Sequence, residues 1–143
     1  MRLVNCGPGE WSDRLSILSL KILVGQEQNK DITHFRTEQT ALLTSIRTRT
    51  LNGTWFEQVL ELAAVNSLLW HAEDDLRAWR EKYKDRGPDS SGLSGGPGSG
   101  FIAATVEKVA RLAFRIQELN DRRAALVQEI NARAGETSGM EKL

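Results

Sequence analysis

Four polar residues recur at helix-core spacing and could bind an anion. Asn120 and Arg123 lie in "RIQELNDRRAALVQEI", on the side of a predicted helix that is otherwise apolar. Asn66 and Glu73 hold equivalent positions in the segment 54–85. A guanidinium group binds carboxylates and phosphates through paired hydrogen bonds. An arginine, a glutamate and amides that converge between helices would therefore suit an anionic small molecule.

The same four residues also have a purely structural interpretation. A single polar side chain in a helical core fixes the register and the oligomeric state, as asparagine does in coiled coils. An unsatisfied buried amide costs about 1–3 kcal/mol, so each asparagine needs partners. Both interpretations predict one hydrogen-bonded layer that consists of Asn66, Glu73, Asn120 and Arg123. The pattern favours the structural interpretation, because polar layers of helical bundles usually serve specificity.

Two histidines each precede a carboxylate by one helical turn, in the pairs His34–Glu38 and His71–Asp75. Carboxylate-bridged metal bundles instead use Glu-x-x-His pairs with further glutamates that all point inward. The chain lacks that motif, so we predict no metal site and no cofactor. Two scattered histidines also give no Ser-His-Asp arrangement. Whether the chain is an enzyme is left open at this point.

Hydrophobic periodicity predicts the helices that must position these residues. Apolar residues repeat at spacings of three and four, no strand pattern occurs, and the fold class is all-α. The expected architecture is an antiparallel helical bundle of four helices, two short then two long, in a single domain 1–143. The predicted helices span about 10–25, 31–48, 54–85 and 101–134.

The boundaries of these helices carry further expectations. The Gly/Ser-rich run 87–100 has too few apolar residues to pack and predicts a flexible linker before the last helix. Residues 135–143 are expected to form a disordered tail. The third helix is expected to open with a capping box of Thr54 and Glu57.

The apolar side of each long helix forms a predicted seam of the coiled-coil type. The seam of the third helix is Val59, Leu62, Asn66, Leu69, Glu73, Leu76, Arg80 and Tyr83. The seam of the fourth helix is Ile102, Val106, Val109, Ala113, Ile116, Asn120, Arg123, Val127 and Ile130. The residues expected to flank this second seam are Leu112, Leu119 and Leu126. Arg122 points away from it and is expected to pair with Glu118.

Composition excludes several classes of protein. The 143 residues carry 19 basic and 19 acidic side chains, whereas a nucleic-acid binder needs a basic excess to displace counterions. No apolar run approaches the roughly 18 residues of a membrane span. The first residues lack the apolar region of a signal peptide. The single cysteine, Cys6, forms no internal disulfide, and these features together predict a cytoplasmic protein.

Three blocks of the sequence resemble a known bacterial family. The blocks are "GEWSDRLSILSLKI", "VNSLLWHAEDDLR" and "LNDRRAALVQEIN", and the family is catalogued as domain of unknown function 6165. Arg14 stands where the family usually has lysine, and the Gly/Ser run is longer than usual. The matching residues are Gly9, Glu10, Asp13, Arg14, Lys21, Asn66, Trp70, Glu73, Asp74, Arg77, Asn120, Asp121, Arg122 and Arg123. The resemblance implies a soluble bacterial protein associated with surface-glycan biosynthesis, with no known activity.

The resemblance also extends the polar layer. Asp13 and Lys21 of the first helix match the family blocks and could join the layer, which gives a ligand site about the same weight as a structural role. The candidate residues for the layer or ligand site are Asp13, Lys21, Asn66, Glu73, Arg77, Asn120, Asp121 and Arg123.

Three functions from different classes remain open. The first is a non-catalytic module that associates with itself or with a partner protein. The second is an accessory or binding protein that holds a small anionic metabolite between its helices. The third, at the lowest weight, is a cofactor-free enzyme similar to chorismate mutase. The two long helices should span about 45–50 Å, which the two short helices cannot cover, so we predict a homodimer.

Overall fold

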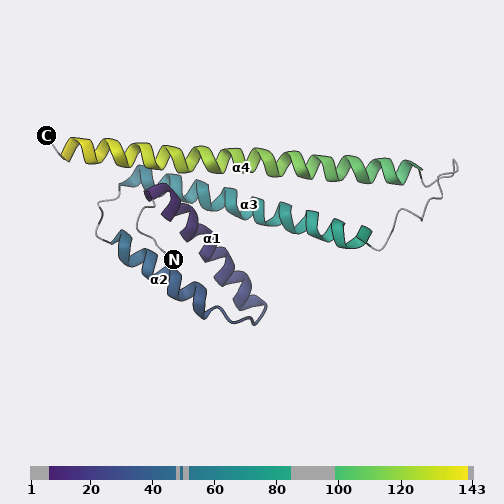
Figure 1. The fold of residues 1–143 in the computed structure, drawn as a ribbon, viewed down its shortest axis with the longest axis horizontal. Helices are drawn as coiled ribbons and strands as arrows, with labels where there is room; N and C mark the ends of the chain where they lie inside the picture. Colours follow the sequence, from purple (N-terminus) through teal and green to yellow (C-terminus); the bar gives the residue numbers. More distant parts are fainter. Residues whose placement is uncertain (1–6, 48, 50–51, 85–98, 142–143) are drawn as a thin grey trace. The chain divides into compact units, whose positions relative to one another are not determined.

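The computed structural model describes residues 7–47, 49, 52–84 and 99–141, and this part of the chain is built of α-helices without strands (Figure 1). The all-α class is confirmed, and the helices follow the expected order of two short and two long. The bounds are α1 Pro8–Glu27, α2 Thr33–Ile46, α3 Gly53–Lys84 and α4 Ser99–Glu141.

The ends of α4 differ from expectation. The predicted linker 87–100 lies outside the described residues except for Ser99 and Gly100, which begin the helix. Residues 135–141, where a disordered tail was expected, continue the helix to Glu141.

The chain divides into two compact units. The first unit consists of residues 1–67 and 122–143, and the second consists of residues 68–121. The first unit therefore contains α1, α2, the first half of α3 and the last part of α4. The second contains only the remaining lengths of α3 and α4. The predicted single domain 1–143 stays a prediction.

The hairpin of α1 and α2 has its own apolar core. The two helices lie side by side (Figure 1). Full burial of a leucine side chain stabilises a fold by about 1.5–3 kcal/mol, and Leu18 and Leu42 are both fully buried here. The core residues are Trp11, Leu18, Leu42 and Ile46, packed against Leu15 and Phe35.

A tight turn joins these two helices. Lys30 N–H donates to the Gly25 carbonyl and Asn29 N–H to the Gln26 carbonyl, which is the paired pattern of a Schellman motif. Asn29 has a φ of 52°, in the left-handed region that asparagine tolerates better than most residues. The turn therefore satisfies the last carbonyls of α1 and reverses the chain within a few residues.

The start of α3 corrects the expected capping box. Asn52 precedes the helix, and its side-chain oxygen accepts a hydrogen bond of 2.9 Å from the Trp55 backbone N–H. Asparagine is among the best N-cap residues, so the helix begins at Gly53, one residue before Thr54. The capping box of Thr54 and Glu57 is therefore wrong.

The buried face of each long helix also differs in part from its predicted seam. On α3, Leu62, Asn66 and Leu69 are buried as predicted. Glu73 and Arg80 are exposed, and the seam passes through Ala72 and Trp79 instead. Glutamate and arginine favour water over an apolar core, so the helix turns the neighbouring apolar residues inward.

On α4, the leucines that we expected at the flank form the buried face. Leu119 and Leu126 are buried, and Leu112 is half-buried. Val106, with 63% of its surface exposed, and Asn120 lie outside. Leucine offers more apolar area than valine or alanine. The helix therefore rotates by about one residue from the predicted seam.

Candidate functional site

Three helices of the first unit meet at the carboxylate of Asp13. This carboxylate, on α1, accepts a hydrogen bond of 2.8 Å from Asn66 Nδ2 on α3. It also accepts two from Arg123 on α4, at 2.9 Å from Nε and 2.5 Å from Nη2. Asn66 Nδ2 donates a further bond of 2.6 Å to Ser16 Oγ. We call Asp13, Ser16, Asn66 and Arg123 the Asp13 cluster.

Small polar residues on α1 allow these helices to approach one another. Ser12 and Ser16 are buried, and each hydroxyl donates to a carbonyl of its own helix, of Pro8 and Asp13 respectively. The Ser12 hydroxyl also accepts a hydrogen bond of 3.1 Å from the Trp55 indole N–H. The hydroxyls thus satisfy polar groups of α3 in a place where larger side chains would hold the helices apart.

The N-terminus of α1 packs against α4 without a cap of its own. Gly7 is the N-cap residue and has no side chain, so the side chain of Asn131 accepts a 2.8 Å hydrogen bond from the Gly9 N–H instead. The Asn131 amide group also donates to the Glu10 carboxylate. A Cβ atom on Gly9 would lie 2.2 Å from the Val127 carbonyl oxygen. The glycine is therefore required by the close approach of the two backbones.

The side chains of the Asp13 cluster form hydrogen bonds with one another. The two charges form a paired, two-bond contact, which is the strong geometry for arginine and a carboxylate. Within the described residues, no buried side-chain nitrogen or oxygen lacks a hydrogen-bond partner. An anionic ligand would have to displace Asp13 from Arg123. The geometry thus suits a contact that fixes α1, α3 and α4 to one another.

The remaining candidate on α1, Lys21, belongs to a different contact. Its ammonium group lies 5.3 Å from the centroid of the Phe35 ring on α2. Nearby, Arg14 donates two hydrogen bonds to Glu38, at 2.6 and 2.9 Å. These bonds lower the pKa of Glu38, and the positive charges of Arg14 and Lys21 add to the effect. The pair fastens α1 to α2.

Four of the predicted residues lie in the second unit and are exposed. Arg77 bonds to Asp74 on its own helix, and the Asp121 carboxylate accepts a 3.0 Å hydrogen bond from Gln117. Glu73 and Asn120 are exposed and have no side-chain hydrogen bond within the described part of the chain. Of the predicted layer, Asn66 and Arg123 are joined through Asp13, which was expected to extend it, whereas Glu73 and Asn120 lie outside this contact.

The partner of Arg122 also differs from the predicted Glu118. Arg122 donates to the Glu61 carboxylate of α3, at 2.8 Å from Nε, and this contact raises the pKa of Arg122. Glu118 instead lies 3.8 Å from Arg115 on its own helix. The helical spacing allowed either partner, and packing of α4 on α3 places Glu61 within reach.

Sequence reasoning missed three parts of this arrangement, namely Ser16, Asn131 and the close approach at Gly9. The sequence pointed to two of them, because Gly9 is the first residue of one quoted block and Asn131 is the last residue of another. Among the described residues, no group of three or more His, Cys, Asp and Glu side chains is arranged to hold a metal ion. Nor is any helix in the described ranges both long and apolar enough to cross a membrane.

Comparison of the chain with protein-family models, with curated proteins and with solved structures finds no match. The function must therefore be argued from the geometry above.

Proposed function

We propose that this chain is a non-catalytic helical module that associates with a second copy of itself through the second unit. The observation that carries the proposal is the apolar surface that this unit leaves exposed to solvent. It contains two helix segments, and Phe114 and Val106 on α4 are 73% and 63% exposed. Exposed apolar side chains that follow one another along a helix are typical of interaction sites.

Two helices alone cannot enclose a core, because each helix has a neighbour on only one side. Among the described residues of the second unit, the buried apolar ones are Leu69, Ala72 and Leu119. The ring of Trp79 stacks on Tyr83 at 5.4 Å, and both remain half-buried. Helical bundles complete such hairpins with further helices, and a second copy would supply them.

Helix lengths and charge support self-association. α3 and α4 contain 32 and 43 residues, and α1 and α2 contain 20 and 14. At 1.5 Å per residue the long helices extend to about 48 and 64 Å, well beyond the short ones. The net charge of the chain is zero, so two copies do not repel one another.

The Asp13 cluster supports the non-catalytic character of this proposal. Arg123, the arginine that a metabolite would bind, already has a carboxylate partner in Asp13. The resemblance to domain of unknown function 6165 extends the proposal to a cytoplasmic accessory role in bacterial surface-glycan biosynthesis. In that role the module would bring its partners together rather than carry out a reaction.

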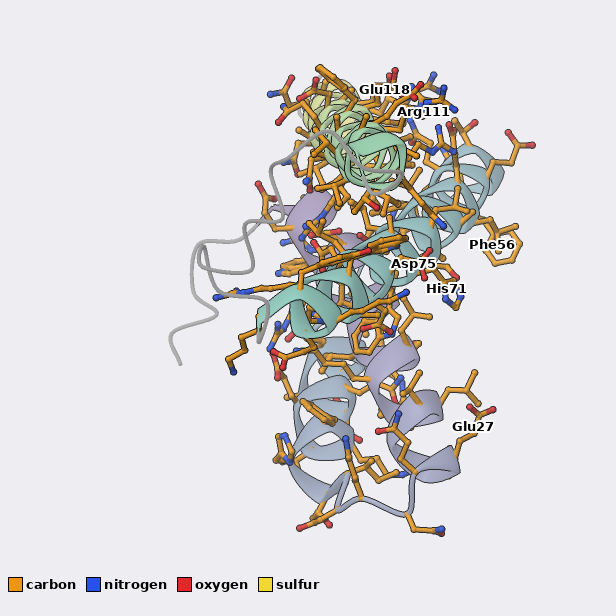
Figure 2. The ribbon with its side chains drawn as sticks, turned by 90° about the vertical axis from the view of Figure 1, so that its right-hand side faces the viewer. Glu27, Phe56, His71, Asp75, Arg111 and Glu118 are labelled. Carbon is orange, nitrogen blue, oxygen red and sulfur yellow. The ribbon has the colours of Figure 1, made fainter. Side chains whose placement is uncertain are left out.

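Sedimentation equilibrium tests the proposal directly. The chain has a mass of 16.0 kDa, and we expect a larger mass at micromolar concentration. Phe114→Ser should shift the mass towards the monomer, because it removes the most exposed large apolar side chain of the described residues. Phe56→Ser is the matched control, since Phe56 is similarly exposed but projects from α3 in the first unit (Figure 2). A wild-type chain that remains monomeric would overturn the proposal.

A further inference from the structure

The side of α2 that faces away from Leu42 and Ile46 has an unusual composition for an exposed helix surface. It consists of four threonines and one alanine, and we call it the threonine face: Thr33, Thr37, Thr40, Ala41 and Thr44. Threonine is a poor helix former, so solvent exposure alone gives no reason to place four of them here. Contact with a partner would give a reason for them.

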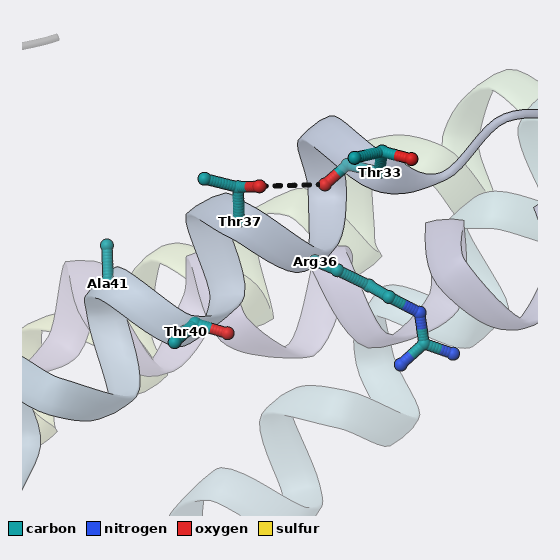
Figure 3. Close-up of a pocket in the computed structure, with 5 residues that line it drawn as sticks. All are labelled: Thr33, Arg36, Thr37, Thr40 and Ala41. Atoms are coloured by element: carbon teal, nitrogen blue, oxygen red, sulfur yellow. Dashed lines mark hydrogen bonds between the residues drawn. The ribbon is translucent and has the colours of Figure 1, made fainter.

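A shallow depression of about 510 Å³ lies on this face (Figure 3). It is lined by Thr33, Arg36, Thr37, Thr40 and Ala41. The Thr37 hydroxyl donates back to the Thr33 carbonyl at 3.0 Å, and the Thr44 hydroxyl to the Thr40 carbonyl at 2.8 Å. With these hydroxyls turned to the backbone, threonine methyl groups are left to contact an apolar side chain.

Two arginines border the threonine face and are available for a partner. Arg36 and Arg47 form no ion pair with any acidic residue in the part of the chain that the structure describes. Glu38, the single carboxylate of α2, bonds to Arg14. The two arginines are eleven positions apart, which places them about 16 Å apart along nearly the same side of the helix.

The exposed side of α4 in the second unit offers a complementary pattern. Val106, Ala110 and Phe114 follow one another at spacings of four, and we call them the Phe114 face. Glu107 and Glu118 border it and are also eleven positions apart. Their partners in the ion pairs are Arg111 and Arg115 of the same helix, and Arg111 and Glu118 project from α4 (Figure 2). Such exposed pairs contribute little, so both glutamates can exchange partners.

Resting on the self-association proposed above, we propose that the threonine face of one copy binds the Phe114 face of a second copy. The Phe114 ring enters the depression beside Arg36, where a guanidinium group can stack on an aromatic ring. Arg36 and Arg47 then pair with Glu107 and Glu118 of the other copy. The equal spacing of the two pairs is the observation that selects a second copy as the partner.

A charge swap tests this pairing. Arg36→Glu with Arg47→Glu places like charges across the interface, as does Glu107→Arg with Glu118→Arg in the other direction. Each double variant alone should associate at least about tenfold more weakly than the wild type, because like charges across an interface are repulsive. A mixture of the two variants should regain association, since each then presents the opposite charge to the other. Association should also weaken with added salt.

The matched control for the arginine reversal is Lys30→Glu with Arg80→Glu. It lowers the net charge by the same amount at exposed positions outside both faces. It should associate as the wild type does. Circular dichroism checks the folding of each variant, and Arg36→Gln with Arg47→Gln is a milder pair that should also weaken association.

The possible outcomes separate the two proposals. If the wild type associates and the arginine reversals have no effect, or if the mixture does not recover, this pairing is wrong and self-association stands. If the wild type is monomeric, both proposals fail. A monomeric wild type whose threonine face binds an acidic helix of another protein would likewise reject the second copy as the partner.

Discussion

Four helix segments pack together in the first unit, and two pack together in the second. Most of the fully buried apolar residues, including Leu18, Leu42, Leu62, Leu126 and Ile130, belong to the first. Phe114 and Val106, the most exposed large apolar residues in the described chain, belong to the second. The two units therefore differ in how far each one completes its own core.

Ion pairs repeat this contrast. In the first unit Asp13, Glu38 and Glu61 each bond to an arginine of another helix. In the second unit the ion pairs in the described chain join residues of one helix, as in Arg77–Asp74 and Arg111–Glu107. Pairs between helices fix tertiary structure, whereas pairs along one helix support only that helix. The second unit is thus the place where a partner has the most to add.

The largest effect is expected at Gly9. Gly9→Ala should reduce the free energy of unfolding by about 3 kcal/mol, because the new Cβ would meet the Val127 carbonyl oxygen at 2.2 Å and push α1 from α4. Gly135→Ala is the control. Nothing lies within 4 Å of its Cβ position, so alanine should stabilise α4 by about 0.5–1 kcal/mol. Urea unfolding at one fixed chain concentration compares the variants, and equal stability for both would contradict the close approach.

The Asp13 cluster should give the next largest effect. Asp13→Ala should cost about 2 kcal/mol, because it leaves Arg123 and Asn66 without their shared acceptor. Asp13→Ala with Arg123→Ala should cost less than the sum of the single changes, since each single change already breaks the same two-bond contact. Asp121→Ala, at an exposed site, should stay within about 0.5 kcal/mol of the wild type. Additive single effects would show that the contact is not coupled.

A smaller effect should appear in the pH dependence of stability. The pKa of Glu38 is lower in the folded chain because of the hydrogen bond from Arg14. Its contribution is therefore fully present above about pH 4.3, the ordinary glutamate value, and is lost as the pH falls through the lower folded pKa. We expect up to about 1 kcal/mol, since Arg14 is partly exposed. Glu38→Gln should remove this part of the acid sensitivity, and an unchanged pH profile would contradict it.

The smallest effect on folding is expected at Phe114. Its side chain is 73% exposed, so Phe114→Ser should change the free energy of unfolding of the monomer by less than about 0.5 kcal/mol. The measurement is denaturation at a concentration low enough to separate the copies. A loss above about 1 kcal/mol would show that the ring is already buried within one copy.

The sequence predicted the positions of the helices well, and the side of each helix that is buried less well. Periodicity located all four helices because each repeats apolar residues over several turns. It placed Asn66 and Arg123 correctly, but on α4 two neighbouring apolar stripes compete. The helix buries the stripe that contains Leu119 and exposes the one that contains Val106. Asn120 therefore lies at the surface.

Contacts between distant segments were harder to predict. The partnership of Asp13 with Arg123 depends on how α1 crosses α4, and no local spacing encodes that crossing. The requirement for Gly9 arises in the same way, from the Val127 carbonyl of another helix. The sequence therefore predicted that Asp13 could join Asn66 and Arg123, but not the two-bond contact of Asp13 with Arg123 or the approach of Gly9 to Val127.

Hydrogen exchange at two chain concentrations tests the central claim most directly, because it compares the two units within one sample. Association protects amides only where the second copy adds structure. We predict that dilution speeds exchange in residues 103–119 of α4 and leaves residues 11–24 of α1 unchanged. Equal exchange in residues 103–119 at both concentrations, with protection as strong as in α1, would contradict the claim that the second unit is completed by another copy.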